Sequence, residues 1–305
     1  MHRVMITEKN SDLSKVKLNW GRPEFTAYDG MGPLDSLHQA SDAIVSVAGY
    51  FDDKFTSIGS GIMIGPGMVL TASHVLDEFR RTGSEPILLT FLPNNKARTW
   101  LPTETVTCSG PSKYQPESSE YKIVSDLSIL SCELHSDAYL EYPQSLVPLE
   151  LCLPLPGARL WAVGYRHGDF EKDTALVTPL VTSGLVTNVF PHGRGERMPS
   201  PCIEIEMETL GGMSGGPVFN EDGRIIGTVS SSFDGGPTYS TLIWDAMRLS
   251  VEGLPQELWR AESSGILEGI DRGLVRVKGK FKADQGRNIT LTLSDEEMVH
   301  LVPGE

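Results

Sequence analysis

The sequence predicts an all-β protein built from two halves, and three observations support this. Glycine and proline together account for 51 of the 305 residues (31 + 20), without a repeating period, which is typical of many turns joining short strands. Runs rich in β-forming residues recur from residue 43 onward. A proline-rich stretch between residues 143 and 156 separates two series of such runs, so two all-β halves fit better than one continuous sheet.

The expected strands lie on both sides of that stretch. The first series covers residues 44–47, 61–64, 68–70, 87–91 and 127–132. The second covers residues 159–164, 176–181, 185–190, 202–208, 217–219 and 224–230. A helix is expected over 241–251, because its apolar residues can share one broad helical face. Alternation at 274–281 and 289–293 then predicts a small β appendage in the C-terminal tail.

Charge and composition exclude several classes of protein. The formal net charge of −14 argues against nucleic-acid binding, which needs clustered positive charge. The first 17 residues contain no apolar run of the secretory type, and the best membrane-span candidate, 146–165, is broken by prolines and charges, so no membrane association is expected. Without a secretory run or a membrane span, a cytoplasmic location is expected. The four cysteines form no CxxC pair and no HExxH motif is present, so free thiols and no metal or cofactor are expected.

The densest local signal is the segment from Gly211 to Pro217, with Ser214 among four glycines. A serine that attacks a carbonyl group needs an exposed hydroxyl, a base and nearby donors for the developing oxyanion. Glycines allow a sharp backbone turn and a close approach of N–H groups to a substrate. Taken alone, the segment fits a nucleophile loop and an ordinary glycine-rich turn equally well.

A base and an orienting carboxylate are found elsewhere in the chain. His74 follows an expected hairpin, at the exit of its return strand. Asp126 begins an alternating apolar strand, where an unpaired charge would be costly. Asp77, three residues after His74, is a rival carboxylate, although it is better placed to cap backbone N–H groups.

Three segments in the order His, Asp, Ser resemble the motifs of trypsin-like serine peptidases of the chymotrypsin fold. These are Thr-Ala-Ser-His-Val around His74, Ser-Asp-Leu-Ser-Ile-Leu from residue 125, and Gly-Met-Ser-Gly-Gly-Pro around Ser214. The resemblance covers residues 43 to 250 and implies two six-stranded β-barrels with a C-terminal helix. It divides the chain into an N-terminal extension (1–40), a first barrel (41–138), a second barrel with the helix (139–252) and an accessory tail (253–305).

The resemblance also implies residue roles for a serine endopeptidase. His74 would be the general base, Asp126 its orienting carboxylate and Ser214 the nucleophile, with the N–H groups of Gly212 and Ser214 forming the oxyanion hole. Ser230 matches the position that supports the aspartate, and residues 230–232 (Ser230, Ser231 and Ser232) match the strand that pairs with a substrate backbone. A protein or peptide is the implied substrate, and no cofactor is implied.

Two departures from the secreted digestive relatives are informative. Met213 replaces the aspartate that binds a new N-terminal amine after zymogen cleavage, so that ion pair is unavailable. Val75 and Leu210 occupy half-cystine positions, which is consistent with a reducing compartment. Both features resemble bacterial HtrA-type and other intracellular trypsin-like peptidases. With the zymogen switch missing, the tail or a regulatory protein partner is expected to control activity, and deleting residues 256–305 is expected to alter hydrolysis without unfolding the barrels.

The primary specificity pocket has two interpretations. Glu208 lies six residues before Ser214, where the family places the floor of the pocket, and a carboxylate there would favour Lys or Arg before the scissile bond. Alternation along 203–208 would instead make Glu208 the last solvated residue of a strand. Thr209 could then form a small polar pocket, although Val229 replaces the histidine of glutamate-cleaving relatives.

Two other functions compete with proteolysis. The Ser214 segment also fits the G-x-S-x-G elbow of α/β-hydrolases, but that elbow leads into a helix and its histidine follows the serine, where the sequence offers only His300. The second alternative is a catalytically silent, protease-like binding or regulatory module.

Overall fold

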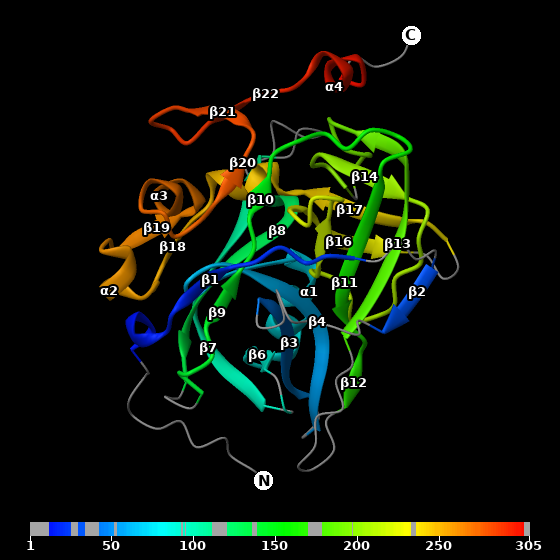
Figure 1. Cartoon of the computed structure of the whole chain (residues 1–305). Helices are drawn as coiled ribbons and strands as arrows, with labels where there is room; N and C mark the ends of the chain where they lie inside the picture. The colour runs from blue at the N-terminus through cyan, green and yellow to red at the C-terminus, as the bar shows by residue number, and fades with distance from the viewer. Residues whose placement is uncertain are drawn as a thin grey trace.

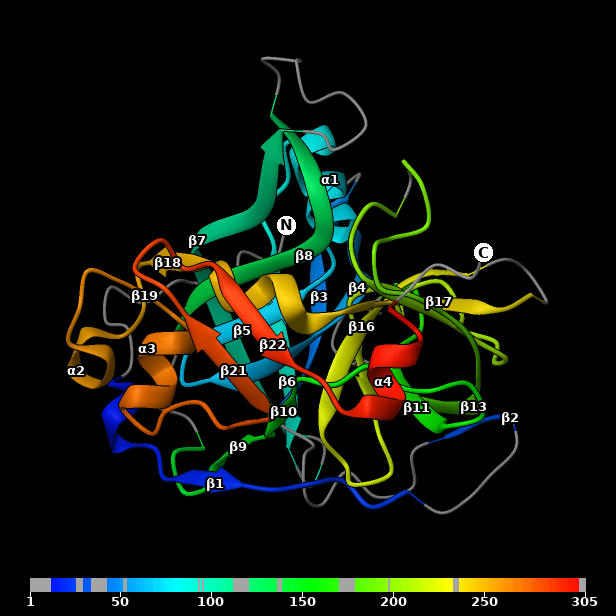
Figure 2. The same cartoon turned by 90° about the horizontal axis from the view of Figure 1, so that it is seen from above.

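The computed structural model, drawn in Figures 1 and 2, describes most of the chain. The described residues are 12–25, 30–33, 43–51, 54–92, 94, 96–111, 121–135, 139–169, 179–196, 198–232 and 236–301. Residues 1–11, 26–29 and 34–40 of the expected extension and residues 176–178 of one expected strand lie outside these ranges.

The first half of the chain forms a closed antiparallel barrel. Its strands are β3 (Ile44–Phe51), β4 (Lys54–Gly65), β5 (Met68–Thr71), β6 (Ile87–Leu92), β7 (Lys96–Pro111) and β8 (Tyr121–Leu134). They pair in the order β4-β3-β6-β7-β8-β5, and β5 returns to β4 to close the ring. Buried and part-buried residues alternate along strand β6, as they do where one face of a barrel strand points into the core.

The second half forms another closed six-stranded barrel beside the first (Figure 1). Its strands are β11 (Arg159–Tyr165), β13 (Pro179–Phe190), β14 (Cys202–Ile205), β15 (Pro217–Phe219), β16 (Ile225–Ser232) and β17 (Thr238–Leu242). They pair in the order β15-β11-β13-β14-β17-β16, and β15 pairs with β16 to close the ring. The predicted fold class, two six-stranded barrels, is therefore confirmed.

The helix expected over 241–251 is much shorter than predicted. The structure has a 3-10 helix, η2, only at Ile243–Arg248. Residues 241 and 242 instead end β17, where Thr241 pairs with Cys202 of β14 and with Thr228 of β16. Residues 250 and 251 begin strand β18 (Ser250–Glu252). Pairing across the sheet thus overrides the local apolar periodicity at both ends.

Segments from the N-terminal part of the chain and from the proline-rich stretch 143–156, here called the linker, join the two barrels. The helix η1 (Leu13–Lys15) leads to strand β1 (Leu18–Trp20), which pairs with β9 (Gln144–Leu146) of the linker. Strand β2 (Gly30–Pro33) adds to β13 of the second barrel. Between them the Phe25 ring stacks on Trp161, with ring centroids 5.5 Å apart. The linker strand β10 (Leu149–Glu150) pairs with β16 of the second barrel.

The tail forms the predicted β appendage, mixed with short helices. Its elements are α2 (Gln256–Trp259), β19 (Ser263–Gly265), α3 (Ile266–Asp271), β20 (Val277–Lys278), β21 (Lys280–Ala283), β22 (Ile289–Thr292) and α4 (Asp295–Val299). Strand β20 pairs with β10, and β21 forms a hairpin with β22 that lies over the barrels in Figure 2. The expected single strand at 274–281 is split at Gly279, whose φ of 123° interrupts an extended chain.

The tail is also part of the largest hydrophobic core. Trp259 is completely buried in the cluster that contains Ile44 and Ile62 of the first barrel and Val163 of the second. Its indole N–H donates to the carbonyl oxygen of Pro66 at 2.8 Å. Removing residues 256–305 would therefore expose part of this core, so we expect the deletion to destabilise the barrels as well as to alter hydrolysis.

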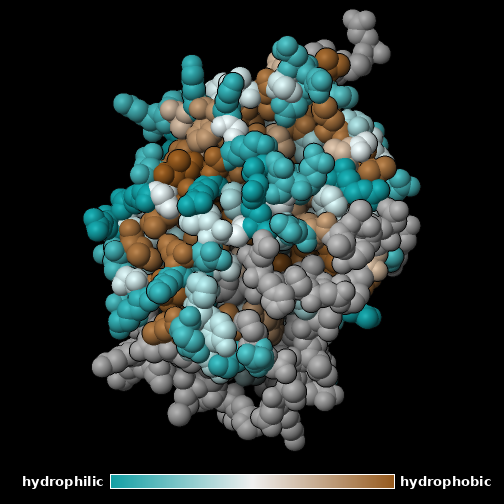
Figure 3. Space-filling model, viewed as in Figure 1, coloured by the Kyte–Doolittle hydropathy of each residue, from teal (hydrophilic) through white to brown (hydrophobic). Residues whose placement is uncertain are grey.

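The outer surface of the described residues carries few large apolar side chains. The exposed ones are Tyr50, Leu185, Met298 and Val299. On the face shown in Figure 3, hydrophilic and hydrophobic residues are interspersed. None of the helices in the described ranges combines the length and apolar character needed to cross a membrane.

Candidate catalytic site between the barrels

His74 lies on the first turn of a helix, not at a strand exit as the sequence suggested. Helix α1 (Ser73–Thr82) starts two residues after β5, with the extended Ala72 as its N-cap. It buries Val75, Leu76 and Phe79 against the first barrel and ends at Gly83, in the left-handed conformation. This buried face fixes the helix, so the imidazole of His74 projects from a rigid element.

Asp126 of β8 binds the imidazole of His74. Nδ1 of His74 lies 2.9 Å from Oδ2 and 3.1 Å from Oδ1 of Asp126. Oδ1 also accepts the backbone N–H of His74 at 3.1 Å. Because an ionised carboxylate only accepts hydrogen bonds, Nδ1 carries the hydrogen and Nε2 is left with its lone pair.

A residue of the second barrel completes the support of this carboxylate. Ser230 of β16 donates its hydroxyl hydrogen to Oδ2 of Asp126. The Ser230 hydroxyl also lies 2.7 Å from Oγ1 of Thr241 on β17. The sequence placed Ser230 beside the aspartate, and the structure brings the two together. By contrast, the rival Asp77 forms an ion pair with Arg80 at 2.7 Å.

Ser214 lies in the tight loop that precedes β15. Its carbonyl oxygen accepts the N–H of Ser60, on β4 of the first barrel, at 2.8 Å. The next residue, Gly215, donates its N–H to the carbonyl oxygen of Val229 on β16 at 2.7 Å and has a φ of +79°. A Cβ at Gly215 would lie 2.2 Å from Oγ1 of Thr71, so only glycine fits there. The loop that carries Ser214 is thus attached to both barrels.

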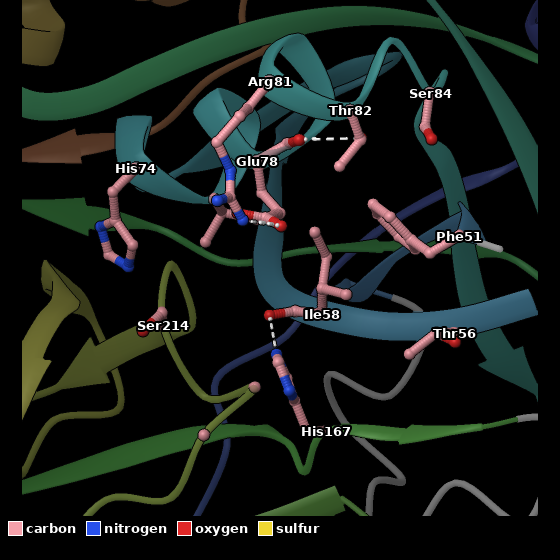
Figure 4. Close-up of a pocket in the computed structure, with 13 residues that line it drawn as sticks. Phe51, Thr56, Ile58, His74, Glu78, Arg81, Thr82, Ser84, His167 and Ser214 are labelled. Carbon is pink, nitrogen blue, oxygen red and sulfur yellow. Dashed lines mark hydrogen bonds and ion pairs between the residues drawn. The ribbon is translucent and has the colours of Figure 1, made fainter.

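His74 and Ser214 line one cavity of about 630 Å³. Figure 4 shows the His74 ring and the Ser214 side chain on the same side of this cavity. In the described part of the chain, no hydrogen bond joins the ring to the Ser214 hydroxyl. Such bonds are often long in the absence of substrate and shorten when it binds.

The predicted oxyanion donors are without protein acceptors. Within the described ranges, neither the N–H of Gly212 nor that of Ser214 donates to a protein group. Gly212 has a φ of +96°, and a Cβ there would lie 2.2 Å from the backbone nitrogen of His167. Two unpaired backbone donors beside a serine suit a developing negative charge on oxygen.

Apolar packing of Met213, the residue before Ser214, holds the loop that carries the serine. The Met213 side chain is completely buried in the core of the second barrel. Its sulfur accepts the backbone N–H of Leu210 at 3.4 Å. The position that the sequence identified as lacking the zymogen aspartate is therefore filled by a hydrophobic anchor.

The predicted specificity residues are only partly brought together. Glu208 is exposed, so the structure does not bury it at the floor of a pocket; the inward side chains of Ile203, Ile205 and Met207 direct it to solvent. Thr209 is buried, and its hydroxyl lies 3.0 Å from that of Thr238.

Two more predicted residues lie on β16. Ser231 lines a second cavity of about 260 Å³, together with Asp126 and Ser230. Ser232 pairs with Thr238 across the sheet, and its side chain lies outside the described structure.

The electrostatic environment raises the pKa of His74. Burial acts to lower it, but the hydrogen bond that the ring donates to Asp126, the charge of Asp126 and the charge of Asp77 outweigh this effect. The charged, protonated form of His74 is thus stabilised. A residue that accepts a proton from a neighbouring hydroxyl group benefits from such stabilisation.

Sequence reasoning missed two residues that shape this loop. The Ser60 hydroxyl donates to the carbonyl oxygen of Gly212 at 2.7 Å and accepts the N–H of Tyr165 at 2.8 Å. His167 donates its backbone N–H to the carbonyl oxygen of Gly211 at 2.6 Å. No motif marks either residue, although Ser60 lies between two glycines in a strand, which indicates close backbone packing.

The described residues offer no site for a metal ion. They contain no group of three or more His, Cys, Asp or Glu side chains arranged to hold one. The four cysteines are free thiols, and burial raises the pKa of the Cys108 thiol to about 11.

Known proteins resemble this chain over more than half of its length. A family model described as a trypsin-like peptidase domain matches residues 59–227. A curated relative, Protease Do-like 2, chloroplastic, of Arabidopsis thaliana, is 27% identical over 180 residues, which is 57% of this chain and 24% of that protein. The chain thus matches about a quarter of the length of that relative.

Solved structures give alignments of similar extent. Deg5 aligns with 17% identity and a TM-score of 0.45, over 68% of this chain and 86% of that chain. A Glu endopeptidase aligns with 19% identity and a TM-score of 0.46, over 70% and 91%.

Proposed function

Because the chain belongs to the trypsin-like peptidase family, we propose that it is a serine endopeptidase with Ser214 as nucleophile, His74 as general base and Asp126 as orienting carboxylate. One observation carries the proposal. Residues from both barrels meet at one cavity: Asp126 lies 2.9 Å from the His74 ring, and His74 and Ser214 line the same wall. This arrangement supports nucleophilic catalysis by serine, in which His74 bonds to the Ser214 hydroxyl once substrate is bound.

The first half of the reaction forms an acyl-enzyme. Nε2 of His74 takes the hydroxyl proton of Ser214 while Oγ attacks the carbonyl carbon of the scissile bond. Asp126 holds the Nδ1 hydrogen and stabilises the imidazolium that forms. His74 then gives its proton to the leaving nitrogen, and the C–N bond breaks.

Water completes the cycle by the same route. His74 takes a proton from water, the hydroxide oxygen bonds to the acyl carbon, and the bond to Oγ breaks as the proton returns to Ser214. In both halves the negative oxygen of the tetrahedral intermediate accepts the N–H groups of Gly212 and Ser214. One such donor is worth about 2.7–4 kcal/mol of transition-state stabilisation.

The oxyanion loop supports activity without zymogen cleavage. The buried Met213 occupies the place where secreted relatives need an aspartate and a new N-terminal amine. Since apolar packing needs no cleaved terminus, the loop is formed in the intact chain. Control by a separate regulatory protein is a further part of the proposal, and the free thiols support a cytoplasmic location.

The primary pocket takes an uncharged polar side chain in this proposal. The exposed Glu208 offers no buried charge for Lys or Arg, whereas the buried Thr209 hydroxyl bonds to that of Thr238, which donates to the carbonyl oxygen of Met207, so this part of the loop is polar and uncharged. Cleavage profiling with a peptide library tests this directly. Preferred cleavage after Arg that is lost in Glu208→Gln would contradict this assignment and support Glu208 as the floor of the pocket.

The endopeptidase function is tested with an unfolded protein substrate. The wild-type chain should produce internal fragments, identified by mass spectrometry, and Ser214→Ala should produce none. Ser263→Ala, which changes a serine in a distant hairpin, serves as the control and should match the wild type. No cleavage by the wild type would favour a silent binding module, and cleavage by Ser214→Ala would remove Ser214 as the nucleophile.

A further inference from the structure

The peptide unit between Gly211 and Gly212 carries one of the two oxyanion donors, and its orientation decides whether the site can work. A flip of this unit would change ψ of residue 211 and φ of residue 212. Because both residues are glycines, no Cβ opposes such a flip. The flip would replace the Gly212 N–H with the Gly211 carbonyl oxygen, which repels an oxyanion. Something other than local sterics must therefore fix the unit.

The backbone of His167 fixes one side of that peptide unit. Its N–H donates to the Gly211 carbonyl oxygen at 2.6 Å. The described chain contains no cis peptide, and in a trans peptide the C=O and N–H groups point in opposite directions. Holding the carbonyl toward His167 therefore turns the Gly212 N–H away from it, to the side where that N–H has no protein acceptor.

The side chain of His167 attaches the same residue to the other barrel. Its Nε2 lies 2.8 Å from the carbonyl oxygen of Ile58 on β4, as Figure 4 shows across the cavity wall. A carbonyl only accepts, so Nε2 carries the hydrogen. The next residues form β12 (Gly168–Asp169), which within the described ranges pairs with β4 at Ser57 and Thr56. The imidazole thus adds an anchor directly beside the residue that holds the peptide.

We propose that His167 is a positioning residue for the oxyanion hole, in which the imidazole anchors its own backbone to β4 so that this backbone keeps the Gly212 N–H directed at the substrate. The inference rests on the proposed function of Ser214. The proposal also gives a role to a histidine that lines the cavity and takes no part in the proposed proton transfers. His167 acts through the peptide unit between Gly211 and Gly212 that it holds.

The rate at which a fluorophosphonate modifies Ser214 tests the role of His167, and this measurement needs no knowledge of the natural substrate. Oγ of Ser214 bonds to phosphorus, fluoride leaves, and the hydroxyl proton passes to His74; the phosphoryl oxygen uses the oxyanion hole. The maximal rate of modification and the concentration for half-maximal rate are measured separately. For His167→Ala, we expect the maximal rate to fall at least about tenfold with the half-maximal concentration within about twofold. A tenfold loss corresponds to about 1.4 kcal/mol.

The chain offers a matched control. His192 is also exposed and also bonds a backbone carbonyl through Nε2, that of Leu301 at 3.1 Å, in a loop of the second barrel. His192→Ala should react like the wild type. His167→Gln, whose amide can still donate to Ile58, should recover part of the rate, and His167→Asn, whose shorter side chain cannot reach, should recover less.

The outcomes separate the inference from the function it rests on. Equal maximal rates for His167→Ala and the wild type, or a change in the half-maximal concentration alone, would overturn the role of His167 and leave Ser214 as nucleophile. If His167→Ala lacks a cooperative thermal transition, equal rates for the Gln and Asn variants would overturn it instead. Absence of wild-type labelling, or labelling that persists in Ser214→Ala, would overturn the proposed function and this inference with it.

Discussion

Ser230 donates its hydroxyl hydrogen to Asp126 although the two residues belong to different barrels. The same carboxylate binds the His74 ring at 2.9 Å, so three side chains from β8, α1 and β16 form one hydrogen-bonded group. The relative position of the barrels is therefore part of the site. A change that moves one barrel against the other would disturb both the support of the imidazole and the position of Ser214, whose loop is attached to both barrels.

Ser230→Ala should lower kcat on the order of tenfold with little effect on KM. The change removes one hydrogen bond to a charged carboxylate, typically worth about 1.5–3 kcal/mol, and part of that loss appears in the orientation of His74. Steady-state kinetics on a cleaved peptide measures it. An unchanged kcat would mean that the bonds from His74 alone hold Asp126.

Hydrolysis should be lost on acidification with a midpoint above about 6.5, the ordinary pKa of histidine, because Asp126 and Asp77 raise the pKa of His74. The general base must be neutral, so activity rises with pH through this pKa. Asp77→Asn removes one of the raising charges and should shift the midpoint downward. Glu78→Gln on the same helix is the control, and equal shifts for the two variants would contradict the specific effect of Asp77.

Gly212→Ala should abolish hydrolysis. Its Cβ would lie 2.2 Å from the His167 nitrogen and 2.6 Å from the Tyr165 carbonyl oxygen, at a φ of +96°. Gly195→Ala is the matched control, since Gly195 also has a positive φ, +83°, but no atom within 4 Å of the added Cβ. Peptide hydrolysis and thermal unfolding are measured for both variants. Gly212→Ala introduces a steric clash and backbone strain, whereas Gly195→Ala introduces the backbone strain alone. Full activity of Gly212→Ala would refute the tight oxyanion loop.

Trp259→Ala should destabilise the whole protein by about 3–5 kcal/mol, because a completely buried indole and its hydrogen bond to Pro66 are lost. Denaturant unfolding measures the free energy, and Met298→Ala at an exposed position of the tail provides the baseline. A loss below about 1 kcal/mol would mean that the tail docks on the barrels without supporting them.

The sequence predicted the barrels and the three side chains of the site because both signals are local. Turn residues separate the strands, and His74, Asp126 and Ser214 each lie in a short motif with a distinctive order along the chain. The helix at 241–251 was overestimated because an apolar pattern cannot reveal that Thr241 is paired with two neighbouring strands.

The features that the sequence could not predict depend on backbone groups and on exposure. His167 holds Gly211 through its own N–H, and every residue except proline has such a donor, so no residue type signals the contact. Glu208 matched a motif position, but strand β14 ends at Ile205, three residues before it, and Glu208 lies exposed in the following loop.

Trapping of the acyl-enzyme tests the central claim most directly. A peptide ester substrate is mixed with the protein, the reaction is stopped in acid within the first turnover, and the digested protein is mapped by mass spectrometry. We predict the acyl group of the substrate on Ser214 in the wild type, and no adduct and no turnover in Ser214→Ala. Turnover without any adduct, or an adduct on another side chain, would contradict a nucleophilic Ser214.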